Sequence, residues 1–177
     1  MKGLGLLLAA ALVAAAPAAD AHGPTRQKVT RSVAIAAPPD KVWSLVGDFA
    51  AMDRWHPAVE KTQAEGGNTP GATRVLVLKG GGEIAEKLER YEPEKRSYFY
   101  RITDVNIDVL PVANYSAWIE VKPGDGGGAL VEWRGAFYRG YMNNDPPEQY
   151  NDEAARTAVT GVYDAGLANL KALAEGQ

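Results

Sequence analysis

The chain has 177 residues, no cysteine and a formal net charge of −3 at pH 7. Without cysteine it can form neither a disulfide nor a thiolate metal site, and a mildly acidic chain with no basic block is not expected to bind nucleic acid. Its length fits one domain with a sizeable core.

The N-terminal residues have the pattern of a secretory signal peptide. Lys2 is followed by an apolar run over residues 4–16, which is shorter than a membrane span, and Ala19-Asp20-Ala21 fits a cleavage site. We therefore expect residues 1–21 to be removed and residues 22–177 to form a single exported domain with no membrane span. Its location could be periplasmic or extracellular, and a small exported domain without disulfides fits a bacterial periplasm. A cut three residues earlier, or a retained membrane anchor, is the alternative.

A strand and two short helices are predicted next. Residues 28–36 alternate between polar and apolar side chains, which predicts a strand. Pro38-Pro39-Asp40 then opens a short helix, because proline suits a first helical turn. A second helical turn within residues 48–57 should end at His56, since Pro57 disfavours helix at the residue before it. The buried stripe of the first helix is expected to consist of Val42, Leu45, Val46 and Phe49.

The middle of the chain changes to a period of two, which is typical of strands. Glycine-rich turns separate the expected strands, and such short connections favour antiparallel neighbours. The six strands are predicted at residues 59–65, 72–79, 83–91, 97–104, 113–122 and 129–139. The longer link over residues 105–112 is expected to form a mobile lip.

One long helix is predicted over residues 147–174. Asp145 is the expected N-cap, with prolines in the first turn. A helix of this length needs a broad cover for its apolar stripe, and the strands are the only extensive surface the sequence offers. The fold class is thus α+β, with a curved seven-stranded antiparallel sheet wrapped around the last helix. The stripe is expected to be Ala155, Val159, Val162, Gly166, Leu170 and Leu173, widened by Tyr163 and Leu167.

Several motifs in chain order carry a family resemblance: Ala37-Pro38-Pro39 with Val42-Trp43, Gly47-Asp48-Phe49, Trp55-His56-Pro57, Val131-Glu132-Trp133 and Tyr163-x-x-Gly166-Leu167-x-x-Leu170. With them the chain resembles the START-like, Bet v 1-like (SRPBCC) superfamily, in particular its polyketide cyclase/dehydrase branch. This resemblance implies a helix-grip fold with an internal cavity, but no single activity, because members of the superfamily bind or process unrelated ligands.

A narrower resemblance is to MxaD-type proteins, which are periplasmic accessories of bacterial methanol oxidation. It is carried by His22-Gly23-Pro24, by the Trp-His-Pro triplet and by Leu110-Pro111-Val112-x-Asn114-Tyr115. It implies a periplasmic dehydrogenase or cytochrome as a partner.

Strand parity gathers aromatic side chains on the face that looks toward the last helix. We expect them to line a pocket for a small hydrophobic or aromatic ligand; the alternative is plain core packing. The expected ligand-binding residues are Trp55, His56, Glu86, Tyr98, Tyr100, Tyr115, Trp133 and Phe137.

Two of these residues could carry acid–base chemistry. Glu86 could be a general acid or base with a raised pKa, or else it pairs with an arginine or is solvated. His56 could carry a proton at the cavity mouth, or else the Trp-His-Pro corner is structural. His22 at a cleaved N-terminus could chelate copper together with His56, but a disordered arm is the simpler interpretation, so no metal or other cofactor is predicted.

The function that follows is a periplasmic binding or accessory protein without enzymatic activity. It would hold a small hydrophobic ligand or dock on a redox enzyme. The alternative is a cyclase- or dehydratase-like enzyme that uses Glu86, His56 or a tyrosine. An enzyme requires at least two polar groups aimed at one point in the cavity, which distinguishes the two hypotheses.

Overall fold

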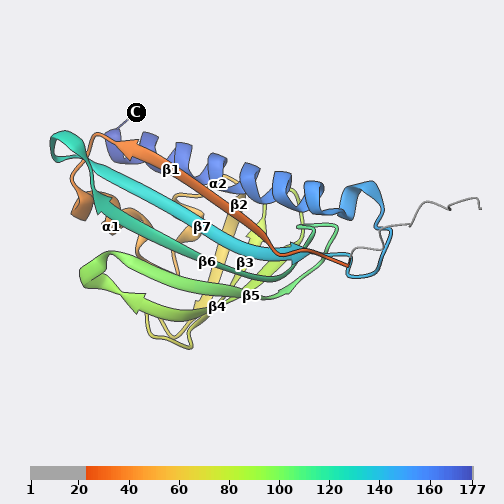
Figure 1. Cartoon of the computed structure of the whole chain (residues 1–177). Coiled ribbons are helices and arrows are strands. Elements are labelled where there is room, and N and C mark those ends of the chain that lie inside the picture. The colour runs from red at the N-terminus through yellow and green to blue at the C-terminus, as the bar shows by residue number, and fades with distance from the viewer. Residues whose placement is uncertain (1–22, 177) are drawn as a thin grey trace, which may run out of the picture.

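A computed structural model describes residues 23–176 of the chain (Figure 1). The expected signal peptide and His22 lie outside the described residues. The strands are β1 (Gln27–Ile35), β2 (Val59–Glu65), β3 (Thr73–Leu78), β4 (Glu83–Glu92), β5 (Ser97–Val105), β6 (Val112–Pro123) and β7 (Ala129–Arg139). The helices are α1 (Pro39–Val46) and α2 (Asp152–Glu175), with short 3-10 turns at Met52–Arg54, Pro93–Lys95, Asp125–Gly127 and Glu148–Tyr150. Every strand lies within one residue of its predicted bounds at each end.

The strands form one antiparallel sheet in the order β1-β7-β6-β5-β4-β3-β2. From β2 to β7 each strand pairs with the next one in the chain, whereas β1 pairs with β7 over the register Gln27↔Phe137 to Ile35↔Ala129. Figure 1 shows α2 lying along the sheet, and its contacts are mainly with β1 and β7. The predicted α+β helix-grip architecture, with seven strands around a long C-terminal helix, is confirmed.

Helix α2 begins five residues later than predicted, at Asp152 rather than at residue 147. Its N-cap is Asn151, whose side-chain oxygen accepts a hydrogen bond from the Ala154 amide at 2.8 Å. The predicted cap Asp145 has a φ of 53°, far from the extended conformation typical of an N-cap, and the following prolines lead into the separate turn at Glu148–Tyr150. The prolines therefore precede a separate turn and not the first turn of α2.

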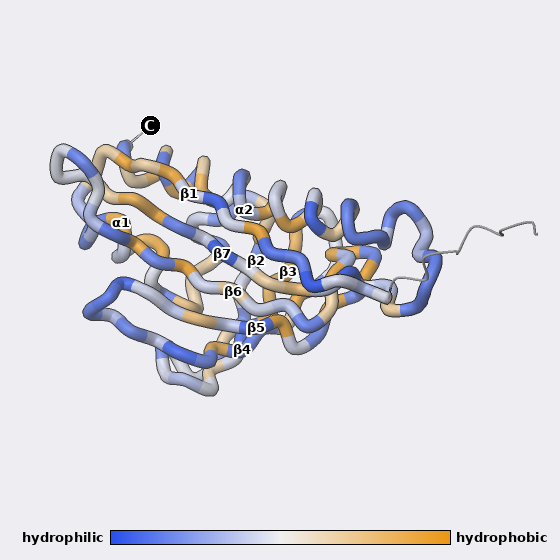
Figure 2. The backbone as a smooth tube through the Cα atoms, viewed as in Figure 1, coloured by the Kyte–Doolittle hydropathy of each residue, from blue (hydrophilic) through white to orange (hydrophobic). Residues whose placement is uncertain are grey.

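The buried face of α2 is also rotated slightly from the predicted stripe. Leu173 is 42% exposed, and the neighbouring Ala174 is buried in its place. An α-helix advances 3.6 residues per turn, so a stripe extrapolated over many turns drifts around the helix. Figure 2 shows the resulting contrast between polar and apolar positions along α2. The buried residues are Ala155, Val159, Tyr163, Gly166, Leu167, Leu170 and Ala174.

Two glycines allow α2 and the sheet to approach each other closely. A side chain at Gly135 on β7 would overlap the Tyr163 hydroxyl, so the tyrosine lies directly over the strand. A Cβ atom at Gly166 on α2 would lie 2.6 Å from the His56 Cδ2 atom and 2.9 Å from the Trp133 Cζ3 atom. Both distances are too short for real contacts, so the two glycines allow three large side chains, Tyr163, His56 and Trp133, to pack between α2 and the sheet.

No helix within residues 23–176 is both long enough and apolar enough to cross a membrane.

Candidate functional site

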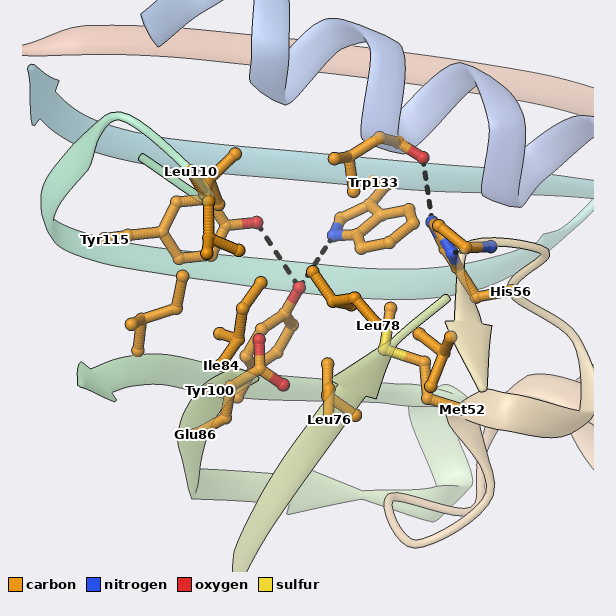
Figure 3. Close-up of a pocket in the computed structure, with 15 residues that line it drawn as sticks. Met52, His56, Leu76, Leu78, Ile84, Glu86, Tyr100, Leu110, Tyr115 and Trp133 are labelled. Atoms are coloured by element: carbon orange, nitrogen blue, oxygen red, sulfur yellow. Dashed lines mark hydrogen bonds between the residues drawn. The ribbon is translucent and has the colours of Figure 1, made fainter. Parts of the chain in front are cut away.

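A cavity of about 80 Å³ lies between the inner face of the sheet, α2 and the 106–111 link (Figure 3). Most of the side chains in its wall are aliphatic, and Met52 adds a thioether. The polar or aromatic lining residues are His56, Glu86, Tyr100, Tyr115 and Trp133. The remaining lining residues are Met52, Ala58, Val59, Leu76, Leu78, Ile84, Ile102, Val109, Leu110 and Val162. A partly enclosed, mainly apolar cavity with a few polar groups is typical of a small-molecule site.

The volume of the cavity limits what it can hold in this conformation. A cavity of about 150 Å³ is enough to bind benzene, and pockets for drug-sized ligands measure roughly 300–1,000 Å³. The cavity therefore accepts only a molecule of a few heavy atoms unless part of its wall moves.

Glu86 on β4 forms a buried ion pair with Arg74 on β3. The Arg74 Nε atom donates to the Glu86 Oε2 atom at 2.6 Å, and the exposed fractions of the two side chains are 0% and 5%. The Arg74 Nη1 atom donates to the Phe49 carbonyl oxygen at 2.8 Å, and the guanidinium lies 4.1 Å from the centre of the Phe49 ring. Burial raises the pKa of Glu86, while the charge and hydrogen bond of Arg74 oppose that rise. The carboxylate is thus held at the cavity wall by a fixed positive charge.

Three tyrosine hydroxyls form a row beside the carboxylate. The Trp133 Nε1 atom donates to the Tyr100 hydroxyl at 3.1 Å, the Tyr100 and Tyr115 oxygens are 3.4 Å apart, and the Tyr115 and Tyr163 oxygens are 2.6 Å apart. Burial raises the pKa of all three tyrosines well above the ordinary value. They therefore stay protonated near neutral pH and act as hydrogen-bonding groups.

His56 is placed where the expected Trp-His-Pro corner meets α2. Its Nε2 atom lies 3.0 Å from the Val162 carbonyl oxygen, and its Nδ1 atom accepts a hydrogen bond from the Ala58 amide at 3.3 Å. Since a carbonyl can only accept, Nε2 carries the proton in this arrangement. Burial lowers the pKa of His56. Both ring nitrogens are occupied in holding the corner against α2, so neither is free for a ligand or a metal in this conformation.

Metal binding finds no support among the described residues. Within residues 23–176 no group of three or more histidine, aspartate or glutamate side chains is placed to hold a metal ion. The other histidine, His22, lies outside that range.

The 106–111 link between β5 and β6 covers one end of the cavity, and we call it the lip. The amides of Val109 and Leu110 both donate to the Asn106 carbonyl oxygen, at 2.9 and 3.1 Å. Leu110 is only 7% exposed and lines the cavity beside Val109. At its outer side the Tyr150 hydroxyl donates to the Asp108 carboxylate. The lip is therefore a compact turn attached to the body at a few points.

The structure brings together five of the eight residues predicted to bind ligand. His56, Glu86, Tyr100, Tyr115 and Trp133 line the cavity. Trp55, Tyr98 and Phe137 do not line it, and they are buried in the hydrophobic core instead. Trp55 packs against Trp133, Tyr98 against Phe49, and Phe137 against Tyr115, with ring centres 5.6, 6.1 and 6.0 Å apart. Parity identified the correct face of each strand, but it carries no information on how far along the strand the cavity extends.

Arg74 is the important residue that sequence reasoning missed, although the pattern around it held a usable signal. Arg74 alternates with Leu76 and Leu78, so parity assigns it to the inner face. The glycine-rich turn after Leu78 closes the hairpin, and its register pairs Arg74 directly with Glu86. Once that register is known, an arginine and a glutamate that face each other on the inner side of the hairpin predict a buried ion pair.

Comparison with known proteins places the chain among known relatives. A family model described as polyketide cyclase / dehydrase and lipid transport matches residues 26–175. The protein XoxI from Bacillus cereus is 32% identical with a TM-score of 0.70, over 83% of this chain and 94% of that one. A protein from Thermobifida fusca is 33% identical with a TM-score of 0.64, over 81% and 90%. Norcoclaurine synthase from Thalictrum flavum shares the fold at 16% identity and a TM-score of 0.65, over 86% and 95%. No curated protein matches the chain.

Proposed function

The chain belongs to the polyketide cyclase / dehydrase and lipid transport family. On that premise we propose that it is a non-enzymatic protein, which holds a small, mainly apolar ligand in the cavity between α2 and the sheet. The observation that carries the proposal is the composition of the cavity wall. Its aliphatic and aromatic side chains come from β2 through β7, from the lip and from α2. Burial of apolar ligand surface there supplies the binding free energy, at about 25 cal/mol per Å².

Glu86 and Tyr100 both line the cavity, so the convergence of polar groups that an enzyme requires is met in part, but the protonation states of the polar groups favour binding over catalysis. An efficient acid or base has a pKa near the working pH. The tyrosine pKa values are raised well above neutrality, and both His56 nitrogens are already in hydrogen bonds. Glu86 is bound to Arg74. A cyclase- or dehydratase-like enzyme is the alternative, and turnover that depends on Glu86 or His56 would establish it.

The proposal extends to the location and the partner of the protein. The pattern of residues 1–21 supports export to the periplasm, and a chain that still begins at Met1 after export would contradict cleavage. The MxaD-type motif Leu110-Pro111-Val112-x-Asn114-Tyr115 covers the end of the lip and the start of β6, which supports docking of a periplasmic dehydrogenase or cytochrome at the cavity mouth.

Thermal unfolding with toluene tests the binding proposal. A ligand at ten times its Kd stabilises the native state by about 1.4 kcal/mol, which raises the Tm of a protein of this size by roughly 3–6 °C. Toluene is larger than the cavity in the described conformation, so its binding requires the wall to move at the lip. We expect this rise for the native chain. Leu76→Phe fills the cavity and should abolish the rise.

Val75→Phe is the matched control. Val75 lies on the same strand but on the opposite face, so this variant should respond to toluene as the native chain does. Equal responses of the two phenylalanine variants would show that toluene binds elsewhere and would contradict the proposal.

A further inference from the structure

The cavity contains one polar corner, formed by Glu86 and Tyr100. Figure 3 shows the carboxylate and this tyrosine on the same side of the cavity. The hydrogen-bond partners already present around them define which group of a ligand could be received there.

Glu86 can accept one more hydrogen bond. Its Oε2 atom accepts from Arg74. An ionised carboxylate has about four lone-pair sites on two oxygens, so capacity to accept remains. The charge of the carboxylate, in contrast, is already compensated, because the Arg74 guanidinium lies against it with 0% of its side chain exposed. The corner thus offers a strong acceptor without demanding a positively charged ligand.

Tyr100 can donate one hydrogen bond. Its oxygen accepts from the Trp133 Nε1 atom, so its own proton must find another acceptor. The available one is the Tyr115 oxygen at 3.4 Å, whereas the usual O–H···O distance is about 2.7–2.8 Å. Tyr115 is engaged more closely by Tyr163, at 2.6 Å. The Tyr100 proton is therefore only weakly held within the row.

Glu86 and Tyr100 lie on neighbouring strands, where Glu86 pairs with Ile102 and Tyr100 with Leu88, and both line the cavity. An acceptor and a donor placed in this way match a hydroxyl group, which both donates and accepts. We propose, building on the proposed function, that the cavity selects small apolar ligands with one neutral hydroxyl group, an alcohol or a phenol, which donates to Glu86 and accepts from Tyr100. An ether or carbonyl ligand would leave Glu86 without a new donor. A carboxylate ligand would face the Glu86 charge, and an ammonium ligand would face Arg74.

The test compares phenol, anisole and toluene, which share a ring but differ in the polar group. Their affinities are measured for the purified protein by calorimetric or NMR titration. We expect phenol to bind at least tenfold more tightly than anisole, which has the oxygen but no proton to donate. Tenfold is the lower range for a hydrogen bond to a charged group.

Removal of the ion pair provides the decisive variant. Glu86→Gln alone would leave Arg74 unpaired in the core and could unfold the chain. Both residues are therefore changed together, as Arg74→Met with Glu86→Met, because apolar replacement of a whole buried ion pair is often tolerated. This double variant should still bind toluene, while its phenol-to-toluene affinity ratio falls at least tenfold.

The control is Glu89→Gln with Arg101→Gln. This is a partly exposed ion pair on β4 and β5 that does not line the cavity, so the phenol-to-toluene affinity ratio of this variant should stay that of the native chain. If toluene binds but the ratio is unchanged in the methionine variant, the hydroxyl inference is wrong and the proposed function stands. If none of the three probes binds the native chain, the proposed function itself is wrong.

Discussion

The absence of a side chain at Gly166 allows α2 to approach His56 and Trp133 in the cavity wall. We predict that Gly166→Ala destabilises the protein, because the new methyl group would overlap His56 and Trp133. Overpacking of this kind costs about 1–3 kcal/mol, which outweighs the gain of about 1 kcal/mol from the better helix propensity of alanine. The measurement is urea-induced unfolding.

Gly161 on the same helix is the matched control. Nothing lies within 4 Å of a Cβ atom built there, so Gly161→Ala should stabilise the protein by roughly 0.5–1 kcal/mol. Opposite signs for the two variants are the expected result, and stabilisation by both would show that His56 and Trp133 do not pack against α2 as described.

The sequence predicted the types of the site residues better than their roles. Glu86 was placed on the inner face correctly, and its pairing with an arginine was one of the alternatives considered. Which arginine pairs with Glu86 depends on the register of the β3–β4 hairpin. The glycine-rich turn in the sequence does not determine that register to better than one or two residues. The hydroxyl row could not be predicted, because it joins Tyr100, Tyr115 and Tyr163 from three elements.

The lip is the element that must move if a ligand larger than a few heavy atoms is to enter. A Cβ atom at Gly82, in the turn between β3 and β4, would lie 3.4 Å from the Val109 Cβ atom, close to the spacing of about 3.5–4.5 Å in disulfides. We predict that Gly82→Cys with Val109→Cys forms a disulfide that fixes the lip, and that the oxidised form binds toluene at least tenfold more slowly than the reduced form.

The oxidised and reduced forms of this variant are each other's control. Gly82 has a φ of +90°, so cysteine is strained there, but the strain is present in both forms. The native chain has no cysteine that could form a competing pair. Equal association rates in the two forms would mean that ligands enter by a route that does not involve the lip.

The strands could be predicted closely from the sequence because each one alternates and is closed by a glycine-rich turn. The start of α2 was predicted less well, since Asp145-Pro146-Pro147 resembles a helix start and Asn151 is equally suited to be a cap. Which of two acceptable caps is used depends on how the chain leaves β7. Arg139, the last residue of β7, donates to the carbonyl oxygens of Tyr141 and Asn143 and so holds the intervening loop in a non-helical path.

For the whole molecule, four buried tyrosines predict how stability depends on alkaline pH. Burial raises the pKa of Tyr98 to about 12, and those of Tyr100, Tyr115 and Tyr163 are raised as well. In the unfolded chain a tyrosine has a pKa of about 10. The neutral hydroxyls therefore stabilise the fold fully below pH 10, and this contribution is lost as the pH rises toward the folded values. At pH 11 the loss is about 1.4 kcal/mol for each of the four groups.

The measurement is the ultraviolet absorbance of tyrosinate together with circular dichroism, both as a function of pH. We expect the buried tyrosines to ionise only when the sheet unfolds, in one cooperative step above pH 10. Ionisation of all eight tyrosines while the circular dichroism stays native would contradict the described burial.

The pairing of β1 with β7 has a consequence for how the chain acquires its fold. The first strand has no partner until a strand on the order of a hundred residues later has been made, and α2, which covers both, comes last of all. At about 5–20 residues per second, synthesis leaves β1 unpaired for roughly 5–20 s. During that interval a cell can thread the chain through a narrow channel or deliver it to a chaperone, because the structure that would block passage cannot yet close.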